Sequence, residues 1–147
     1  MAGSKSDAFE TNILSHIFKN TAVTLIGDAA GILPSAAAGN LYLALYTANP
    51  TDSTSGTETV YTNYTRIAVV RSAAGWTVTG NTVTNAAVVN FPACGATGAT
   101  ISGFAICTGS TVSASDQLFW GSLTSNLTVS SGITPTFAIG DLSITED

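Results

Sequence analysis

The side chains that could carry chemistry are few in this sequence and far apart along it. One histidine, His16, and two cysteines, Cys94 and Cys107, accompany nine acidic residues in a chain of 147. A catalytic or metal-binding histidine needs a partner side chain beside it, and the sequence has no second histidine. Because His16 falls on the polar face of a predicted helix, we expect it to be exposed and to have no catalytic role.

The acidic residues are scattered through predicted turns. A glycosidase would need two carboxyl groups roughly 5–9.5 Å apart across a cleft, and nothing in the sequence points to such a pair. Short carboxylates stabilise turns, which is the role we expect for Asp52 and Asp141. The GxSxG, P-loop and HExxH motifs are absent. The sequence therefore predicts a protein that is not an enzyme, with no catalytic residues, cofactor or metal site. The carboxylates considered are Asp28, Asp52, Glu58, Asp116 and Asp141.

The two cysteines form no CxxC motif and have no histidines to share a metal with. Free cysteine behaves as a small hydrophobic residue, which favours two buried thiols in strands. A cross-strand disulfide between Cys94 and Cys107 is the alternative, and a reducing cytosol would act against it.

The charge content is low, with four basic and nine acidic residues and a formal net charge of −5. A protein that binds nucleic acid by neutralising phosphates commonly makes about 6–10 such contacts. This chain has only Lys5, Lys19, Arg66 and Arg71 for that purpose. It also lacks a basic stripe for an anionic membrane and an apolar run near the roughly 20 residues of a membrane span. We expect no nucleic-acid or membrane partner, and no apolar signal core is visible near the N-terminus.

Residues 6–20 predict the single helix. Asp7 with Glu10 three residues later has the form of a capping box. Apolar residues recur at helical spacing on one face, and this amphipathic face could pack on the chain's own sheet or dock on a neighbouring subunit. The residues of this face are Phe9, Ile13, Leu14, Ile17 and Phe18.

The remainder of the chain predicts strands. Residues 21–39 form a connector without a steady period, and residues 40–147 form a β-sandwich. In the strand that follows Asn40, three leucines alternate with Tyr42, Ala44 and Tyr46. Both of its faces are apolar, which is typical of an interior strand. Asn49-Pro50 ends this strand, because proline cannot donate a hydrogen bond to the ladder.

Short strands then recur about every ten residues. Gly80-Asn81 forms a two-residue hairpin turn that pairs Val78 with Val83. The last strand changes phase at Gly140-Asp141, which predicts a bulge or a sharp bend. This spacing predicts an all-β fold, an antiparallel β-sandwich or flattened barrel with one N-terminal helix, in a single domain over residues 1–147. The expected later strands are 65–72, 76–84 as a hairpin, 86–91, 101–107, 117–123, 127–129 and 134–144.

Six aromatic residues could stack on sugar rings or fill the core. Core packing is favoured for Tyr42 and Tyr46, which share a strand face, and for Trp120, which lies inside the apolar segment LFWGSL. Tyr61 and Tyr64 border a polar loop and are expected to stay free for contact. The six are Tyr42, Tyr46, Tyr61, Tyr64, Trp76 and Trp120.

Six segments follow the helix in a distinctive order: LYLALYTANPTD, YTRIAVV, TNAAVVNFP, ISGFAI, LFWGSLT and FAIGDLSIT. In this order the chain resembles a family of small virion proteins of tailed bacteriophages, whose members are often labelled tail-fibre proteins. The resemblance covers most of the chain. The connector over residues 23–39 is longer than this family usually has.

The resemblance implies a structural protein of the virion, assembled in the host cytoplasm. The heptads, collagen-like triplets and stacked repeats that give a fibre its length are absent. A capsid decoration (cement) protein that stabilises the head shell is therefore favoured, with a minor tail or tail-fibre-associated protein as the rival. A module that binds host glycans is the third hypothesis.

These readings imply protein partners. They are the major capsid protein or tail proteins, together with further copies of the chain in a trimer or dimer. We expect the helix face and the loop over residues 51–64 to supply the contacts. The candidate interface residues are Phe9, Ile13, Ile17, Asp52, Glu58, Tyr61 and Tyr64.

Overall fold

A computed structural model of the chain describes residues 4–24, 26–113 and 116–146. The chain forms two compact units. The first, here called the helical unit, comprises residues 1–40, 70–88 and 138–147, and the second, the sheet unit, comprises residues 41–69 and 89–137. A single domain over residues 1–147 stays a prediction. Parts of that span lie outside the described residues, namely 1–3, 25, 114–115 and 147. Residue 25 is the one of these that falls in the predicted connector.

The helix α1 (Asp7–Lys19) opens the helical unit. Its N-cap is Ser6, whose Oγ accepts a hydrogen bond from the Phe9 amide at 3.4 Å. The capping box with Asp7 as the cap is therefore wrong, because Ser6 has the extended backbone of a cap and Asp7 is already helical. Asn20 ends the helix with a left-handed φ of +54°.

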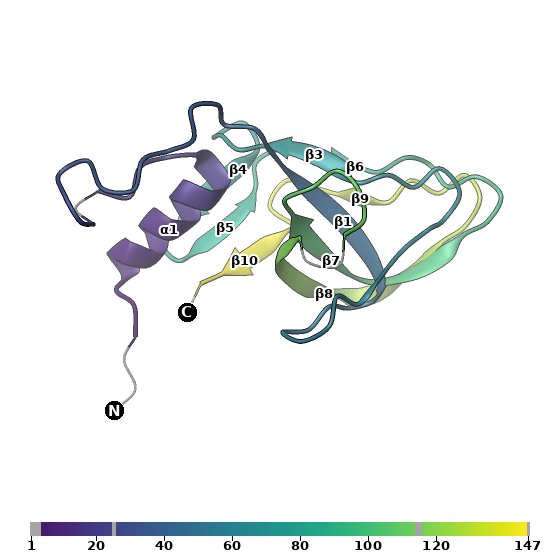
Figure 1. Ribbon diagram of the computed structural model, residues 1–147. Coiled ribbons are helices and arrows are strands. Elements are labelled where there is room, and N and C mark those ends of the chain that lie inside the picture. The colour runs from purple at the N-terminus through teal and green to yellow at the C-terminus, as the bar shows by residue number, and fades with distance from the viewer. Residues whose placement is uncertain (1–3, 25, 114–115, 147) are drawn as a thin grey trace. The chain divides into compact units, whose positions relative to one another are not determined.

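A narrow stripe of α1 is buried. Glu10, Leu14 and Phe18 recur at intervals of four residues, which places them on one side of the helix. The Phe18 ring meets Trp76 edge to face, with centroids 4.8 Å apart. Figure 1 shows α1 alongside β4 (Trp76–Thr79), which begins at Trp76, and β5 (Thr82–Asn85). The helix therefore packs on the chain's own sheet, which was the first of the two roles predicted for its apolar face.

The helical unit holds a three-stranded antiparallel sheet in the order β10 (Ser143–Thr145), β5 (Thr82–Asn85) and β4 (Trp76–Thr79). β4 and β5 pair with Val78 opposite Val83, so the predicted hairpin and its register are confirmed. Gly80 supplies the left-handed φ of +58° that the two-residue turn requires.

The strand predicted over residues 134–144 is interrupted by a turn. β9 (Thr136–Phe137) ends before it, and β10 begins after it. The Asp141 carboxylate accepts a hydrogen bond from the Ala138 amide at 2.8 Å, and Gly140 has a φ of +83°. The buried Asn85 completes the turn, because its Oδ1 accepts from the Leu142 amide at 3.0 Å. The phase change predicted at Gly140-Asp141 is confirmed, and Asp141 stabilises a turn as expected.

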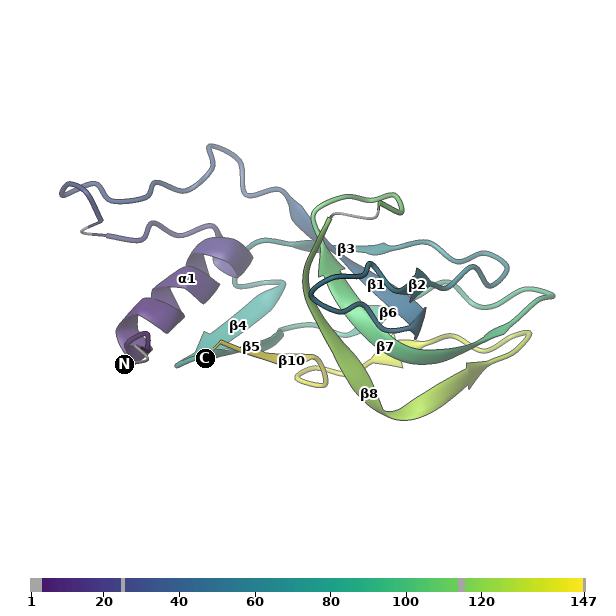
Figure 2. The ribbon, with the colours of Figure 1, turned by 60° about the horizontal axis from the view of Figure 1, so that its bottom comes forward.

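The sheet unit is built on a five-stranded sheet. Its strands follow the order β2 (Thr57–Glu58), β1 (Asn40–Ala48), β7 (Ala99–Cys107) and β8 (Gln117–Val129), and β3 (Ile67–Val70) also pairs with β1. A second small sheet joins β6 (Val89–Asn90) to β9. Figure 2 shows β1, β7 and the long β8 side by side. The strands predicted over residues 117–123 and 127–129 are one strand, whose register shifts between Ile101–Leu127 and Gly103–Ser122.

Both faces of β1 and β7 are covered. On one face Phe104 meets Phe137 of β9 edge to face, with ring centroids 6.1 Å apart, and Phe137 meets Phe91 at 6.3 Å. The other face carries a buried cluster of Ala44, Tyr46, Ala105 and Cys107, with Tyr42 packed against it. β1 is therefore an interior strand, as predicted. The antiparallel sheets and the single N-terminal helix confirm the predicted all-β sandwich class.

Candidate functional site

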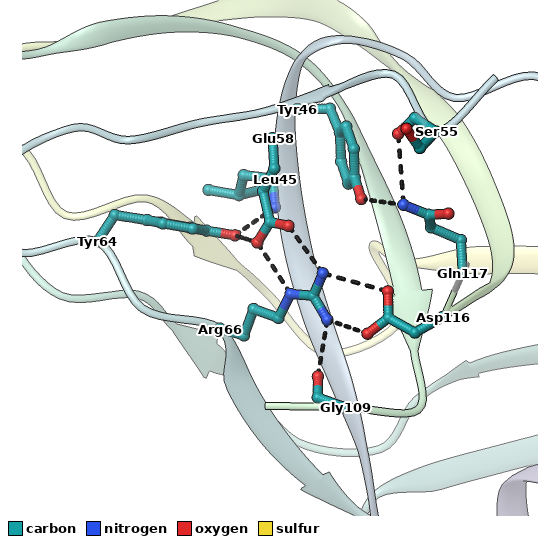
Figure 3. Close-up of polar contacts among 9 residues, drawn as sticks. All are labelled: Leu45, Tyr46, Ser55, Glu58, Tyr64, Arg66, Gly109, Asp116 and Gln117. Atoms are coloured by element: carbon teal, nitrogen blue, oxygen red, sulfur yellow. Dashed lines mark hydrogen bonds and ion pairs between the residues drawn. The ribbon is translucent and has the colours of Figure 1, made fainter. Parts of the chain in front are cut away.

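A buried ionic network lies in the sheet unit around Arg66 (Figure 3). Its guanidinium donates from Nε to Glu58 Oε1 at 2.9 Å and from Nη2 to Glu58 Oε2 at 2.8 Å. Nη1 donates to Asp116 and to the carbonyl of Gly109, the latter at 2.7 Å. The side chains of Arg66, Glu58 and Asp116 are only 1%, 4% and 10% exposed. One arginine therefore ties β2 to the segment that precedes β8.

The network is satisfied by mutual contacts. Burial lowers the pKa of Arg66, but the hydrogen bonds that its guanidinium donates to Glu58 and Asp116 outweigh the effect of burial, and the pKa is raised above its ordinary value. The Tyr64 hydroxyl donates to Glu58 Oε1 at 2.7 Å and accepts from the Leu45 amide at 3.0 Å. Burial raises the pKa of Tyr64. Because each carboxylate is engaged by the guanidinium, the arrangement suits cohesion of the unit better than acid or base chemistry.

Three of the predicted interface residues belong to this interior. Glu58 lies in the network, and the Tyr61 ring is 2% exposed, with its hydroxyl donating to the Pro92 carbonyl at 2.9 Å. Tyr64 is half-buried. The expectation that Tyr61 and Tyr64 stay free for contact is wrong, because the segment after β2 folds back and both hydroxyls are bound inside the unit. Asp52, in contrast, is exposed.

The remaining predicted interface residues lie on α1. Phe9 is 36% exposed, and Ile13 and Ile17 are partly exposed beside the buried stripe. We call these three residues the helix flank. Its role as an interface stays a prediction.

His16 and Arg71 order the C-terminal end of α1. His16 is half-buried rather than exposed, and its Nδ1 lies 2.7 Å from the Thr21 carbonyl, so Nδ1 must carry the proton. The Arg71 guanidinium donates to three backbone carbonyls: Ile17 at 2.6 Å, His16 at 2.8 Å and Ala38 at 3.2 Å. A cation at this end of a helix is favoured by the helix dipole. Both side chains therefore hold the helix end to the connector.

Cys94 and Cys107 are free and buried, as predicted, and the alternative of a disulfide is wrong. Cys107 lies in β7, but the expectation of a strand is wrong for Cys94, which lies in the loop between β6 and β7. Burial raises the pKa of the Cys107 thiol to about 12, which keeps it protonated near neutral pH. Among residues 4–24, 26–113 and 116–146, no cluster of three or more metal-ligating side chains occurs.

Trp120 differs from the other tryptophan. Trp76 and Tyr46 are each 1% exposed, as core packing predicts, whereas Trp120 is 38% exposed. The expectation of core packing is wrong for Trp120, because exposed residues alternate with half-buried ones along this part of β8 and Trp120 is one of the exposed set.

Trp120 borders a pocket of about 280 Å³ on the surface of the sheet unit. The opposite wall is the loop after β1, in which Thr51 and Thr54 pair through their backbones and leave Asp52 and Ser53 at the tip. The residues that line the pocket are Pro50, Thr51, Asp52, Ser53, Thr54, Ser55, Gln117 and Trp120. Polar groups and one exposed indole thus share a single concave surface.

Comparison with known proteins shows which family the chain belongs to. None of the helices described is long and apolar enough to cross a membrane. No curated protein matches the chain. A sequence model of the family described as Podophage GP4 fiber I protein gp80 matches residues 4–145, which agrees with the resemblance to phage virion proteins. The chain therefore belongs to the podophage GP4 fiber I protein gp80 family, a family of phage virion structural proteins.

Proposed function

We propose that the protein is a non-enzymatic component of a fibre on the virion, assembled in the host cytoplasm, and that it acts through contacts with other virion proteins. The match to a fibre family over residues 4–145 carries this proposal. The ionic network supports a non-enzymatic role, since the most buried acidic groups of the sheet unit, Glu58 and Asp116, are already paired with Arg66.

A capsid decoration protein is the second candidate. The sequence lacks the heptads and triplet repeats that would give one chain the length of a fibre. A compact module of this kind would suit a head shell, where it would stabilise the assembled state by binding only to that state. The family description names a fibre protein, and for that reason we favour the fibre. The short length of the chain does not conflict with this, because a fibre can also be assembled from short modules joined to longer chains.

Copy number and position distinguish the two candidates. Purified virions would be analysed on a stained gel, and antibody against this protein would be located by electron microscopy. A fibre component should be present in far fewer copies than the major capsid protein and should be labelled at fibres. Many copies per particle with label across the head, together with a raised disruption temperature of the shell, would establish the decoration role instead.

Self-association is part of the proposal. Symmetric oligomers multiply a modest contact, and a trimer or dimer would bind its neighbours with greater avidity than one copy. The helix flank is the surface we assign to protein contacts, because Phe9 is an apolar residue left 36% exposed next to the buried stripe.

A further inference from the structure

We propose that the pocket between the loop over residues 50–55 and β8 binds one ring of a neutral saccharide. The inference goes beyond the structural role and does not depend on where the protein lies in the virion. It rests on which side chains the fold brings together in the pocket, on their chemistry, and on how firmly they are held.

A bulge in β8 places Gln117 and Trp120 together. Residues three apart on a regular strand point to opposite faces of a sheet. Here Trp120 pairs with Ala105 and Gln117 pairs with Cys107, so two residues of β7 correspond to three of β8. Leu118 is the additional residue, and because Ala105 and Cys107 share a face, Gln117 and Trp120 share it too. Both side chains consequently line the pocket.

The chemistry of the pocket matches a sugar. A hexose has a flat apolar face of C–H groups and a rim of hydroxyls, so it needs an exposed aromatic plane next to hydrogen-bonding groups. Trp120 supplies the plane, being 38% exposed. Asp52 at the loop tip supplies a carboxylate with two acceptor oxygens, which suits two adjacent hydroxyls. The serine and threonine side chains and the Gln117 amide complete the polar lining.

The size and the charge of the pocket limit the kinds of sugar that it can bind. A volume of about 280 Å³ lies just below the roughly 300–1,000 Å³ of typical small-molecule sites, which suits one ring or the end of a chain. None of the eight lining residues that the structure describes is basic, while Asp52 carries a negative charge. A sugar acid would bring a second carboxylate to that charge without compensation. The pocket should therefore select neutral sugars over acidic ones.

The walls are held in place without a ligand. The Gln117 amide donates to the Tyr46 hydroxyl at 2.8 Å and to the Ser55 carbonyl at 3.3 Å, which links β8 to the loop (Figure 3). At the base of the loop, Asn49 donates to Ser122 Oγ at 2.8 Å. A preformed site loses little conformational entropy on binding, so even a small ligand can bind measurably.

The test is a titration of the isotopically labelled full chain followed by two-dimensional NMR. The probes are the methyl glycosides of glucose, galactose, mannose and N-acetylglucosamine, with the methyl glycoside of glucuronic acid as the acidic comparison. At least one neutral sugar should give saturable shifts confined to residues 51–55 and 117–120. The Kd should be about 0.1–10 mM, as expected for so small a ligand.

Variants assign the binding to the pocket. Trp120→Ala should raise the Kd at least about tenfold, because the stacking plane is lost. Asp52→Asn should raise it less and should reduce the preference for the neutral over the acidic sugar. Leu118→Ala is the control, since Leu118 is also exposed on β8, at 41%, but does not line the pocket. Its Kd should change less than about twofold. Unchanged spectra outside the pocket would show that each variant is folded.

Three outcomes would overturn the proposal. They are the absence of saturable shifts with all four neutral sugars at tens of millimolar, shifts that survive unchanged in Trp120→Ala, and equal affinity for the glucuronide. Placement of the protein in the virion would stand whichever result is obtained, because the copy-number and labelling experiment measures it separately.

Discussion

The guanidinium of Arg66 and the carboxylate of Glu58 form a two-point ion pair, with N–O distances of 2.9 Å and 2.8 Å, in which neither side chain is more than 4% exposed. A pair of this geometry is specific for arginine, because lysine offers a single point charge. Asp116 binds the same guanidinium from another segment. The stability of the sheet unit should therefore depend strongly on one side chain.

Arg66→Ala should lower the free energy of unfolding by about 3–5 kcal/mol, because it leaves two carboxylates buried without a counter-charge. Arg66→Lys should also destabilise, since lysine cannot make both fork contacts. Urea denaturation followed by circular dichroism measures the change. Lys5→Ala is the matched control: it removes a more exposed ion pair with Glu146, at 2.8 Å, and should cost only about 0–1 kcal/mol. Equal losses from the two alanine variants would refute a special role for the network.

The burial pattern of α1 gives a second prediction. Phe18→Ala should cost about 3–5 kcal/mol, because Phe18 is fully buried against Trp76. Phe9→Ala should cost less than about 1 kcal/mol, because a third of Phe9 is already exposed and its removal leaves no enclosed cavity. Thermal and urea unfolding of both variants would check the helix orientation. A larger loss from Phe9→Ala than from Phe18→Ala would mean that the helix presents its other side to the sheet.

Arg71 supports the end of the helix through hydrogen bonds to three backbone carbonyls. Arg71→Lys should destabilise the helical unit by about 1–2 kcal/mol, because lysine keeps the charge but cannot reach the carbonyls of Ile17, His16 and Ala38 together. Thermal unfolding gives the stability, and NMR chemical shifts of residues 16–20 report the helix end. Lys19→Gln, which removes a charge from the same last turn, should cost at most about 1 kcal/mol. If Arg71→Lys were neutral, charge rather than geometry would explain the position.

Stability should fall at alkaline pH. Burial raises the pKa of Tyr46 and of Tyr61 from 10.0 to about 12, and that of Cys107 from 9.0 to about 12. Between pH 9 and 12 the unfolded chain loses protons that the folded chain retains. The stabilisation from these neutral groups is thus complete below about pH 9 and lost as the pH rises, by up to about 1.4 kcal/mol per pH unit for each group.

Urea midpoints measured from pH 7 to pH 11 would check this dependence. Tyr61→Phe should be less stable at pH 7, by about 1 kcal/mol, because its hydrogen bond to Pro92 is lost. The same variant should lose stability more gradually above pH 9, since one titrating group is gone. A midpoint that stayed constant from pH 8 to pH 11 would contradict the burial of these hydroxyls and of the thiol.

Local sequence signals were sufficient for the elements they encode directly. Gly80-Asn81 specified the hairpin register because a two-residue turn leaves no other pairing of Val78. The phase change at Gly140-Asp141 located a turn because alternation has a strict period of two. The capping box misled by one residue, since Ser6 offered a cap just ahead of Asp7.

The site depended on contacts that pattern cannot show. Tyr61 and Tyr64 follow a polar loop and read as exposed, yet the chain folds back and buries Tyr61. Trp120 lies in an apolar segment, which favoured core packing, yet it is one of the exposed alternate residues of β8. Arg66 pairs with a residue fifty positions away, Asp116. The only hint of this ion pair in the sequence was that basic residues are rare, with four in 147, and that Arg66 directly precedes an apolar strand.

The helix flank provides the last prediction, because it separates the contact surface of α1 from its core stripe. Deleting residues 1–19 would remove the buried Leu14 and Phe18 along with the surface and would unfold the unit. Phe9→Ser with Ile13→Ser changes only the flank. This double variant should retain its helical circular dichroism but should lower self-association and incorporation into virions by at least about tenfold, as expected when central apolar contacts are lost.

Sedimentation of the purified chain and immunoblots of virions, scaled to the major capsid protein, measure the two effects. Asn12→Ala with Ser15→Ala is the control on the same helix, since it removes polar side chains of similar exposure and leaves the flank intact. If the flank variant is folded and is incorporated normally, the contact surface must lie elsewhere than on the helix flank. Equal losses in both double variants would show that the helix as a whole, and not its apolar flank, is required.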